Sequence, residues 1–144
     1  MEEGNEMKKY QKIALIEVVG TANVGDYLVQ NEGNDADRWV IPKETFESTY
    51  EEVKHDFGWA IRQLKQGNKV GRAGWNGKGM FVVYQKGYPQ GIPCNKQTAD
   101  AWGLNEGDLF KVEPYLQIRM VNGSHAMWVP SINDVLAEDW EVVE

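Results

Sequence analysis

Cysteine is almost absent from this sequence, since Cys94 is the only cysteine among 144 residues. One thiol can form neither an internal disulfide nor a cysteine-based zinc site, and such low usage favours a reducing compartment. No apolar run approaches the roughly 18 residues of a membrane-spanning helix. The N-terminus also lacks the basic segment and apolar core of a secretion signal. We therefore expect a cytoplasmic protein without a membrane partner.

Positive charge is also in short supply, since the formal net charge is −7. Such a chain is a poor partner for long nucleic acid, whose affinity for proteins comes mainly from lysine and arginine. The charge is uneven: residues 57–100 carry seven basic and one acidic side chain, against six and 13 in residues 1–56 and two and eight in residues 101–144. This basic segment suits a small anion, although a solvated basic face balanced by acidic neighbours would give the same pattern.

The first part of the chain, residues 1–54, is predicted to be a small strand-rich unit closed by a helix. Residues rich in β-branched and aromatic side chains alternate with turn-forming residues. We expect strands at 11–19, 26–30 and 38–41, a polar turn at 31–37, and a helix within 43–55. A unit of this size buries little surface, so we expect it to depend on the rest of the chain or on another copy.

The second part, residues 55–144, is predicted to begin with a helix at 56–67, capped by Asp56 and ended by Gly67. Strands are expected at 68–73, 80–85 and 110–121, with a hairpin turn at Asn122-Gly123 and a final strand before the C-terminus. We expect residues 86–95 to be a loop and Thr98 to cap a short helix that ends near Gly103. A helix followed by mostly antiparallel strands predicts an α+β fold, an N-terminal helix plus an antiparallel sheet core domain, preceded by the small strand-rich unit.

The glycine-rich segment VGRAGWNGKGM, residues 70–80, invites comparison with a phosphate-binding P-loop. The comparison fails, because Arg72 occupies the position of the first glycine, Gly79 occupies the serine or threonine position, and a strand is expected afterwards. Glycine amides beside Arg72 can still surround a phosphate. The alternative is a loop whose glycines only satisfy turn geometry.

Tryptophan is abundant for one small core, and flat rings are surfaces on which a base stacks. Core packing is the ordinary role of each ring, but Trp75 lies in a polar loop where core residues are unusual. Further along, Trp128, Ser131, Asn133 and Asp134 surround Pro130 and could read a base or ribose edge. Ser131 and Asp134 also have the spacing of a helix capping box, and both interpretations stay open.

Catalytic sets are weak in this sequence. His125 with Ser124 or Ser131 and Asp134 could be drawn as a hydrolytic triad, but no nucleophile-elbow context surrounds either serine. The two histidines lack metal-ligand spacing, and the carboxylates near the C-terminus are interpreted as a solvated strand: Glu138, Asp139 and Glu141. We therefore expect no enzyme, no metal and no cofactor.

The run FGWAIRQLKQGNKVGRAGWNGKGMFVVY, together with PYLQIRM and MWVPSINDVLAEDW, resembles the Thoeris anti-defence 2 family of phage proteins over about residues 57–144. The resemblance implies a protein of the infected bacterial host's cytoplasm that sequesters glycocyclic ADP-ribose, the signal made by bacterial TIR-domain immune proteins, without cleaving it. It further implies cyclic dinucleotides of CBASS as ligands of a separate site in some members. Homotetramers with ligand pockets at subunit interfaces are also implied.

Carried over to this chain, the resemblance places eight residues around the ligand. They are Arg72, Trp75, Asn76 and Met80 on one wall and Trp128, Ser131, Asn133 and Asp134 on the other. Ile132 and Asn133 depart from the more usual glutamine-threonine type of pair, which puts the hydrogen bonds of that wall in doubt. The N-terminal unit resembles a small module of phage proteins, for which we infer no activity. A nucleotide-processing enzyme and a virion or protein-interaction module are the alternatives.

Overall fold

The computed structural model describes residues 15–22 and 25–144, and the chain divides into two compact units, Met1–Glu52 and Val53–Glu144. Each unit contains its own mostly antiparallel sheet, and four helices accompany the strands, so the fold is α+β. None of the helices formed by the described residues is long and apolar enough to cross a membrane.

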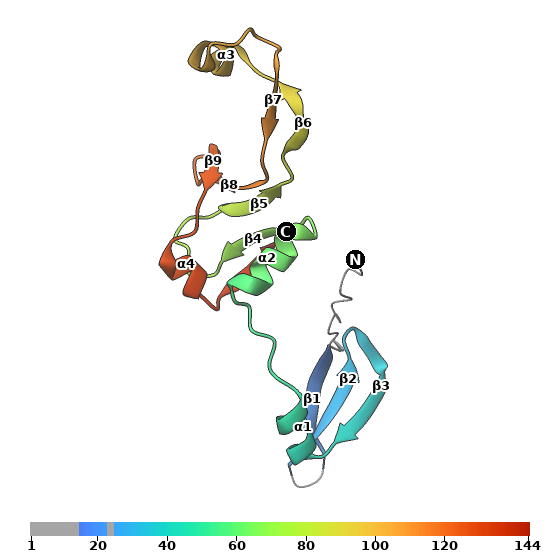
Figure 1. Ribbon diagram of the computed structural model, residues 1–144. Coiled ribbons are helices and arrows are strands. Elements are labelled where there is room, and N and C mark those ends of the chain that lie inside the picture. Colours follow the sequence, from blue (N-terminus) through green and yellow to red (C-terminus); the bar gives the residue numbers. More distant parts are fainter. Residues whose placement is uncertain (1–14, 23–24) are drawn as a thin grey trace, which may run out of the picture. The chain divides into compact units, whose positions relative to one another are not determined.

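The N-terminal unit is an antiparallel meander with one helix (Figure 1). Its elements are β1 (Ile16–Ala22), β2 (Asp26–Asn31), β3 (Asn34–Ile41) and α1 (Lys43–Thr49). Phe46 of α1 stacks on Tyr27 of β2, with ring centroids 4.1 Å apart. Val29 and Ile41 are buried in this small core. The helix therefore contacts the sheet through one aromatic pair.

Two predictions for this unit are wrong in their boundaries. The expected turn at 31–37 is only the short connection around Gly33, whose φ of +72° lets β3 begin at Asn34. The expected helix 43–55 ends at Thr49, because Tyr50 has an extended backbone. Residues 11–14 of the first predicted strand lie outside the described residues.

The C-terminal unit is built on a five-stranded sheet in the order β10-β4-β5-β8-β9. These strands are β4 (Lys69–Arg72), β5 (Phe81–Gln85), β8 (Tyr115–Arg119), β9 (His125–Trp128) and β10 (Trp140–Val143). The helix α2 (Phe57–Lys65) packs against β10, β4 and β5 (Figure 1). Its stripe residues Ala60 and Leu64 are buried with Val70, Val82 and Trp140 in the main core.

The predicted caps of α2 are confirmed. Asp56 accepts a hydrogen bond from the Trp59 backbone N–H at 2.8 Å, as an N-cap does. Gly67 has a φ of +93°, the left-handed conformation that commonly ends a helix. The start and end of α2 are therefore determined locally.

An arm comprising residues 86–114 leaves the large sheet between β5 and β8 (Figure 1). It contains β6 (Tyr88–Pro93), α3 (Lys96–Trp102) and β7 (Leu109–Val112), and β6 and β7 form a two-stranded sheet of their own. The predicted loop at 86–95 is thus wrong, because β6 accommodates Pro89 in an irregular register between Tyr88 and Ile92 and has Pro93 at its last position. The cap of α3 is Asn95 rather than Thr98, whose backbone N–H donates to the Asn95 side chain at 2.8 Å.

The predicted hairpin of β8 and β9 is confirmed, but its turn differs. The Gly123 N–H donates to the Met120 carbonyl at 3.0 Å, and the Met120 N–H donates to the Ser124 carbonyl at 2.7 Å. These bonds enclose a three-residue loop, 121–123, in which Gly123 has a φ of +85°. Asn122 instead uses its side-chain oxygen to accept from the Ser124 N–H at 3.0 Å, and so orders the loop without occupying a two-residue turn.

Candidate functional site

The pairing of β4 with β10 brings the two predicted walls together. Arg72 at the end of β4 lies opposite Trp140 at the start of β10. The glycine-rich segment 70–80 therefore begins beside the chain that leaves the short helix α4 (Ile132–Leu136). Residues about 65 positions apart in the sequence become neighbours through this one antiparallel pair.

The capping box predicted from the sequence is present at the start of α4. Ser131 is the N-cap, and its Oγ accepts from the Asp134 N–H at 3.2 Å. In return, Asp134 Oδ2 accepts from the Ser131 N–H at 3.0 Å and from its hydroxyl at 2.9 Å. This interpretation of Ser131 and Asp134 is confirmed, and it leaves the other Asp134 oxygen free for a second set of partners.

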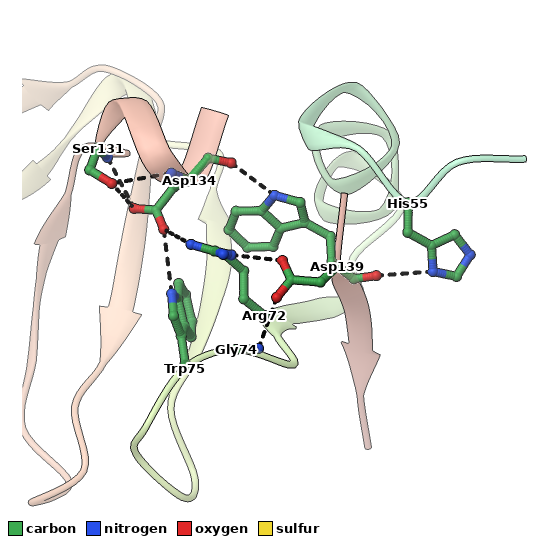
Figure 2. A network of polar contacts seen from close by, with 8 residues as sticks. His55, Arg72, Gly74, Trp75, Ser131, Asp134 and Asp139 are labelled. Carbon is green, nitrogen blue, oxygen red and sulfur yellow. Dashed lines mark hydrogen bonds and ion pairs between the residues drawn. The ribbon is translucent and has the colours of Figure 1, made fainter. Parts of the chain in front are cut away.

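Arg72 lies between two carboxylates (Figure 2). Its Nη1 is 3.0 Å from Asp134 Oδ1, and its Nε is 2.8 Å from Asp139 Oδ1. The side chains of Arg72, Asp134 and Asp139 are 21%, 12% and 35% exposed, so the ion pairs are partly shielded from water. Because two acids face one guanidinium, this trio carries no surplus positive charge. A contact of Arg72 with a ligand phosphate stays a prediction.

Asp139 is the main correction to the expected site. The sequence interpretation placed it on a solvated strand, yet it accepts from Arg72 Nε and from the Gly74 backbone N–H, the latter at 2.8 Å. An added Cβ at Gly74 would lie 2.9 Å from Asp139 Oδ2, so a side chain at this position would displace the carboxylate. The sequence did not reveal this contact, because it depends on the antiparallel pairing of β4 with β10, which brings these distant segments together.

Three tryptophans pack edge to face beside this network. The ring centroids are 5.5 Å apart for Trp75 and Trp140, 6.1 Å for Trp128 and Trp140, and 6.3 Å for Trp75 and Trp128. Trp140 is buried and donates its Nε1–H to the Asp134 carbonyl at 3.0 Å, whereas Trp75 and Trp128 are half-buried. Trp140 is therefore a core residue, and the other two each bury part of the ring and leave part of it accessible.

The network also reaches the Trp75 indole and the helix entry (Figure 2). Trp75 Nε1 lies 3.4 Å from Asp134 Oδ1, a long hydrogen bond. His55, just before α2, places its Nδ1 3.0 Å from the Trp140 carbonyl oxygen and stacks its ring on Trp59 at 4.0 Å. The segment that precedes α2 is thus tied to the start of β10.

The remaining predicted residues lie around the network without joining it. Asn76 and Asn133 are exposed, and within the part of the chain that the structure describes neither side chain makes a hydrogen bond. Met80 is partly buried against the main core. His125 lies on β9 opposite Arg119, while Ser131 and Asp134 are engaged with each other, so the geometry gives the triad alternative no support.

The ion pairs shift the pKa values of their members. Asp139 has a lowered pKa because Arg72 donates a hydrogen bond to it, assisted by the Gly74 N–H. Burial opposes ionisation of Asp134, but the hydrogen bonds from Ser131, Arg72 and Trp75 outweigh it and lower its pKa. The same two carboxylates, Asp139 first, raise the pKa of Arg72. The network therefore favours the ionised form of all three groups.

These directions predict an acid-sensitive fold. An aspartate with a lowered native pKa stabilises the folded state above its unfolded pKa of about 3.9, and this contribution disappears as the pH falls through the native value. We expect the urea midpoint to fall steeply below about pH 4 in the wild-type chain, and less steeply in Asp134→Asn. Urea titrations at a series of pH values measure both slopes. Equal slopes in the two proteins would contradict an ionised Asp134 in the fold.

Comparison with known proteins places the C-terminal unit in a family. Residues 55–143 match the family described as the Thoeris anti-defense 2-like domain. A curated relative named Thoeris anti-defense 2, from Bacillus phage SP01, is 38% identical over 95 residues, which cover 63% of this chain and 97% of the relative. The family match spans Arg72, Asp134 and Asp139. The chain therefore belongs to the Thoeris anti-defense 2-like family.

Proposed function

We propose that this chain is a phage anti-defence protein that binds glycocyclic ADP-ribose and holds it uncleaved, which blocks Thoeris immune signalling in the cytoplasm of the infected bacterium. Ligand binding is assigned to residues 55–144, and no activity is assigned to residues 1–54. The name of the SP01 relative supports the anti-defence role. The identity of the nucleotide comes from the family resemblance.

The observation that carries the proposal is the meeting of segments 72–80 and 128–134 around half-buried tryptophans. Trp75 is held by ring contacts and by its long hydrogen bond to Asp134, and Trp128 is held by ring contacts with Trp75 and Trp140. Each ring therefore presents part of an aromatic surface in a defined orientation. Base stacking on such a ring contributes about 1–3 kcal/mol. Asn76 and Asn133 lie exposed nearby in sequence and offer amide groups for the sugar or base edges.

A sequestering protein must bind tightly and leave the labile bond alone, which requires donors and rings rather than a general base. The two carboxylates of the network are ionised but already engaged with Arg72, Ser131 and Gly74. They are therefore poorly placed to accept a proton from a substrate. This favours binding over a nucleotide-processing reaction. Cyclic dinucleotides at a separate site stay a prediction from the resemblance.

We also propose that the chain acts as a homotetramer with subunits meeting beside the ligand. Large apolar side chains are exposed on two parts of the C-terminal unit, with Trp102 on the arm 67% exposed and Leu136 of α4 73% exposed. Met127, Val129 and Ile132, which precede Leu136 closely in the sequence, are exposed as well. Contiguous exposed apolar groups of this kind mark interaction surfaces. The α4 surface adjoins Ser131 and Asn133, which supports ligand sites at subunit contacts.

Mass spectrometry of the full chain mixed with glycocyclic ADP-ribose tests both proposals. We expect a native mass of about four chains, stoichiometric bound nucleotide, and release of the intact nucleotide when the protein is heated. Dissociation should be slow, because the protein has to outcompete a receptor. Recovery of a cleaved nucleotide would instead support the enzyme alternative, and a monomeric native mass would remove the tetramer.

A further inference from the structure

Asp139 makes three contacts with three consecutive residues of the glycine-rich segment. Its carbonyl oxygen accepts from the Ala73 N–H at 3.0 Å. Its Oδ1 accepts from Arg72 Nε and its Oδ2 from the Gly74 N–H, both at 2.8 Å. One residue thus fixes the backbone and side chain immediately before Trp75 (Figure 2).

Both oxygens of this carboxylate are needed at the same time. An amide in its place has one acceptor and one NH₂ donor, and the donor would face either Arg72 Nε–H or the Gly74 N–H. The space is equally restricted, since a Cβ at Gly74 would lie 2.9 Å from Oδ2. A carboxylate at position 139 thus accepts from both donors, whereas an amide would leave one of them without an acceptor.

We propose that Asp139 is a positioning residue for ligand binding, which holds residues 72–74 so that the Trp75 ring is already oriented when the nucleotide arrives. This inference rests on the proposed function. A loop that is ordered only part of the time binds with an affinity reduced by the fraction of competent molecules. Asp139 acts through Arg72 and Gly74, and its own oxygens are occupied by them.

The direction in which ligand affinity changes when Asp139 loses its charge distinguishes positioning from simple electrostatics. A carboxylate near an anionic nucleotide repels it, so removal of the charge alone should tighten binding. Loss of positioning should weaken it. The adjacent Glu138 provides a matched control, because its side chain is 61% exposed and its partner Lys54 is 3.6 Å away, outside the network. Asp139→Asn and Glu138→Gln change the net charge equally.

Calorimetric titration with glycocyclic ADP-ribose is the first measurement. We expect Asp139→Asn to bind at least about tenfold more weakly than the wild type, because the oriented loop becomes a minor population. Glu138→Gln should bind as the wild type does or slightly more tightly. Unchanged or tighter binding by Asp139→Asn would overturn the inference.

Hydrogen exchange of the free protein is the second measurement, and it needs no ligand. In Asp139→Asn we expect faster exchange in peptides from residues 72–80, with α2 peptides unchanged. If exchange in residues 72–80 did not become faster, or became faster by the same factor in α2, the positioning role would be overturned. If the wild type binds no nucleotide, the proposed function fails alone, since exchange still decides whether Asp139 holds the loop.

A second variant covers the case in which Asp139→Asn does not fold. Gly74→Ala displaces the same carboxylate from the loop side and leaves Asp139 ionised. We expect the same local increase in exchange and the same weaker binding. Where both variants fold, the double variant should be little worse than either single one, because both break one interaction. Fully additive effects would argue for two separate roles.

Discussion

Arg72→Met is expected to lower the free energy of unfolding by about 3 kcal/mol, because removing one member of a shielded ion pair leaves its partners uncompensated. Asp134 supplies most of this effect, since its side chain is 12% exposed. Asp139 is 35% exposed and will recover part of its hydration. Denaturation of the full chain, followed by tryptophan fluorescence, reports mainly on the C-terminal unit, which contains five of the six tryptophans.

Arg62→Met is the matched control for this experiment. Arg62 lies on the exposed side of α2 and forms no ion pair within the described part of the chain. Its replacement should change stability by less than about 0.5 kcal/mol. If Arg72→Met were as stable as Arg62→Met, Arg72 would be a surface cation whose role lies in the ligand alone, and the structural reading of the network would be wrong.

Features set by neighbouring residues were predictable from the sequence. The caps of α2 at Asp56 and Gly67 depend on one side chain and one backbone conformation, and both were identified by type and spacing. The Ser131 and Asp134 capping box has the same local origin. In these cases the physical partner lies within a few positions along the chain, so one short pattern contains the whole interaction.

Features set by strand pairing were not predictable in the same way. Asp139 and Arg72 are 67 positions apart, and no local sequence pattern near either residue indicates that they interact. Strand β6 was missed because Pro89, Gly91 and Pro93 are turn-forming residues. The irregular register between Tyr88 and Ile92 accommodates the first two, and Pro93 is the last residue of the strand. The family motif indicated which residues matter, but only the sheet order explains why an acidic residue near the C-terminus belongs with a glycine-rich loop.

Trp75→Ala is expected to weaken nucleotide binding by about 1–3 kcal/mol if the ring stacks on the base. The substitution will also lower the stability of the fold, because the ring packs against Trp128 and Trp140. Trp75→Phe separates the two contributions. It keeps an aromatic face for stacking but loses the Nε1–H that lies 3.4 Å from Asp134. We therefore expect Trp75→Phe to bind more tightly than Trp75→Ala.

Trp39→Phe, in the N-terminal unit, controls for loss of a tryptophan in general, and its affinity for glycocyclic ADP-ribose should equal that of the wild type. Calorimetry at matched folded fractions compares the four proteins. Equal affinity of Trp75→Ala and the wild type would remove Trp75 from the ligand surface and leave it a core residue beside Trp140. A loss in Trp75→Ala that Trp75→Phe largely restores would instead identify the ring face itself as the contact, because Trp75→Phe lacks the indole hydrogen bond and retains only the aromatic surface.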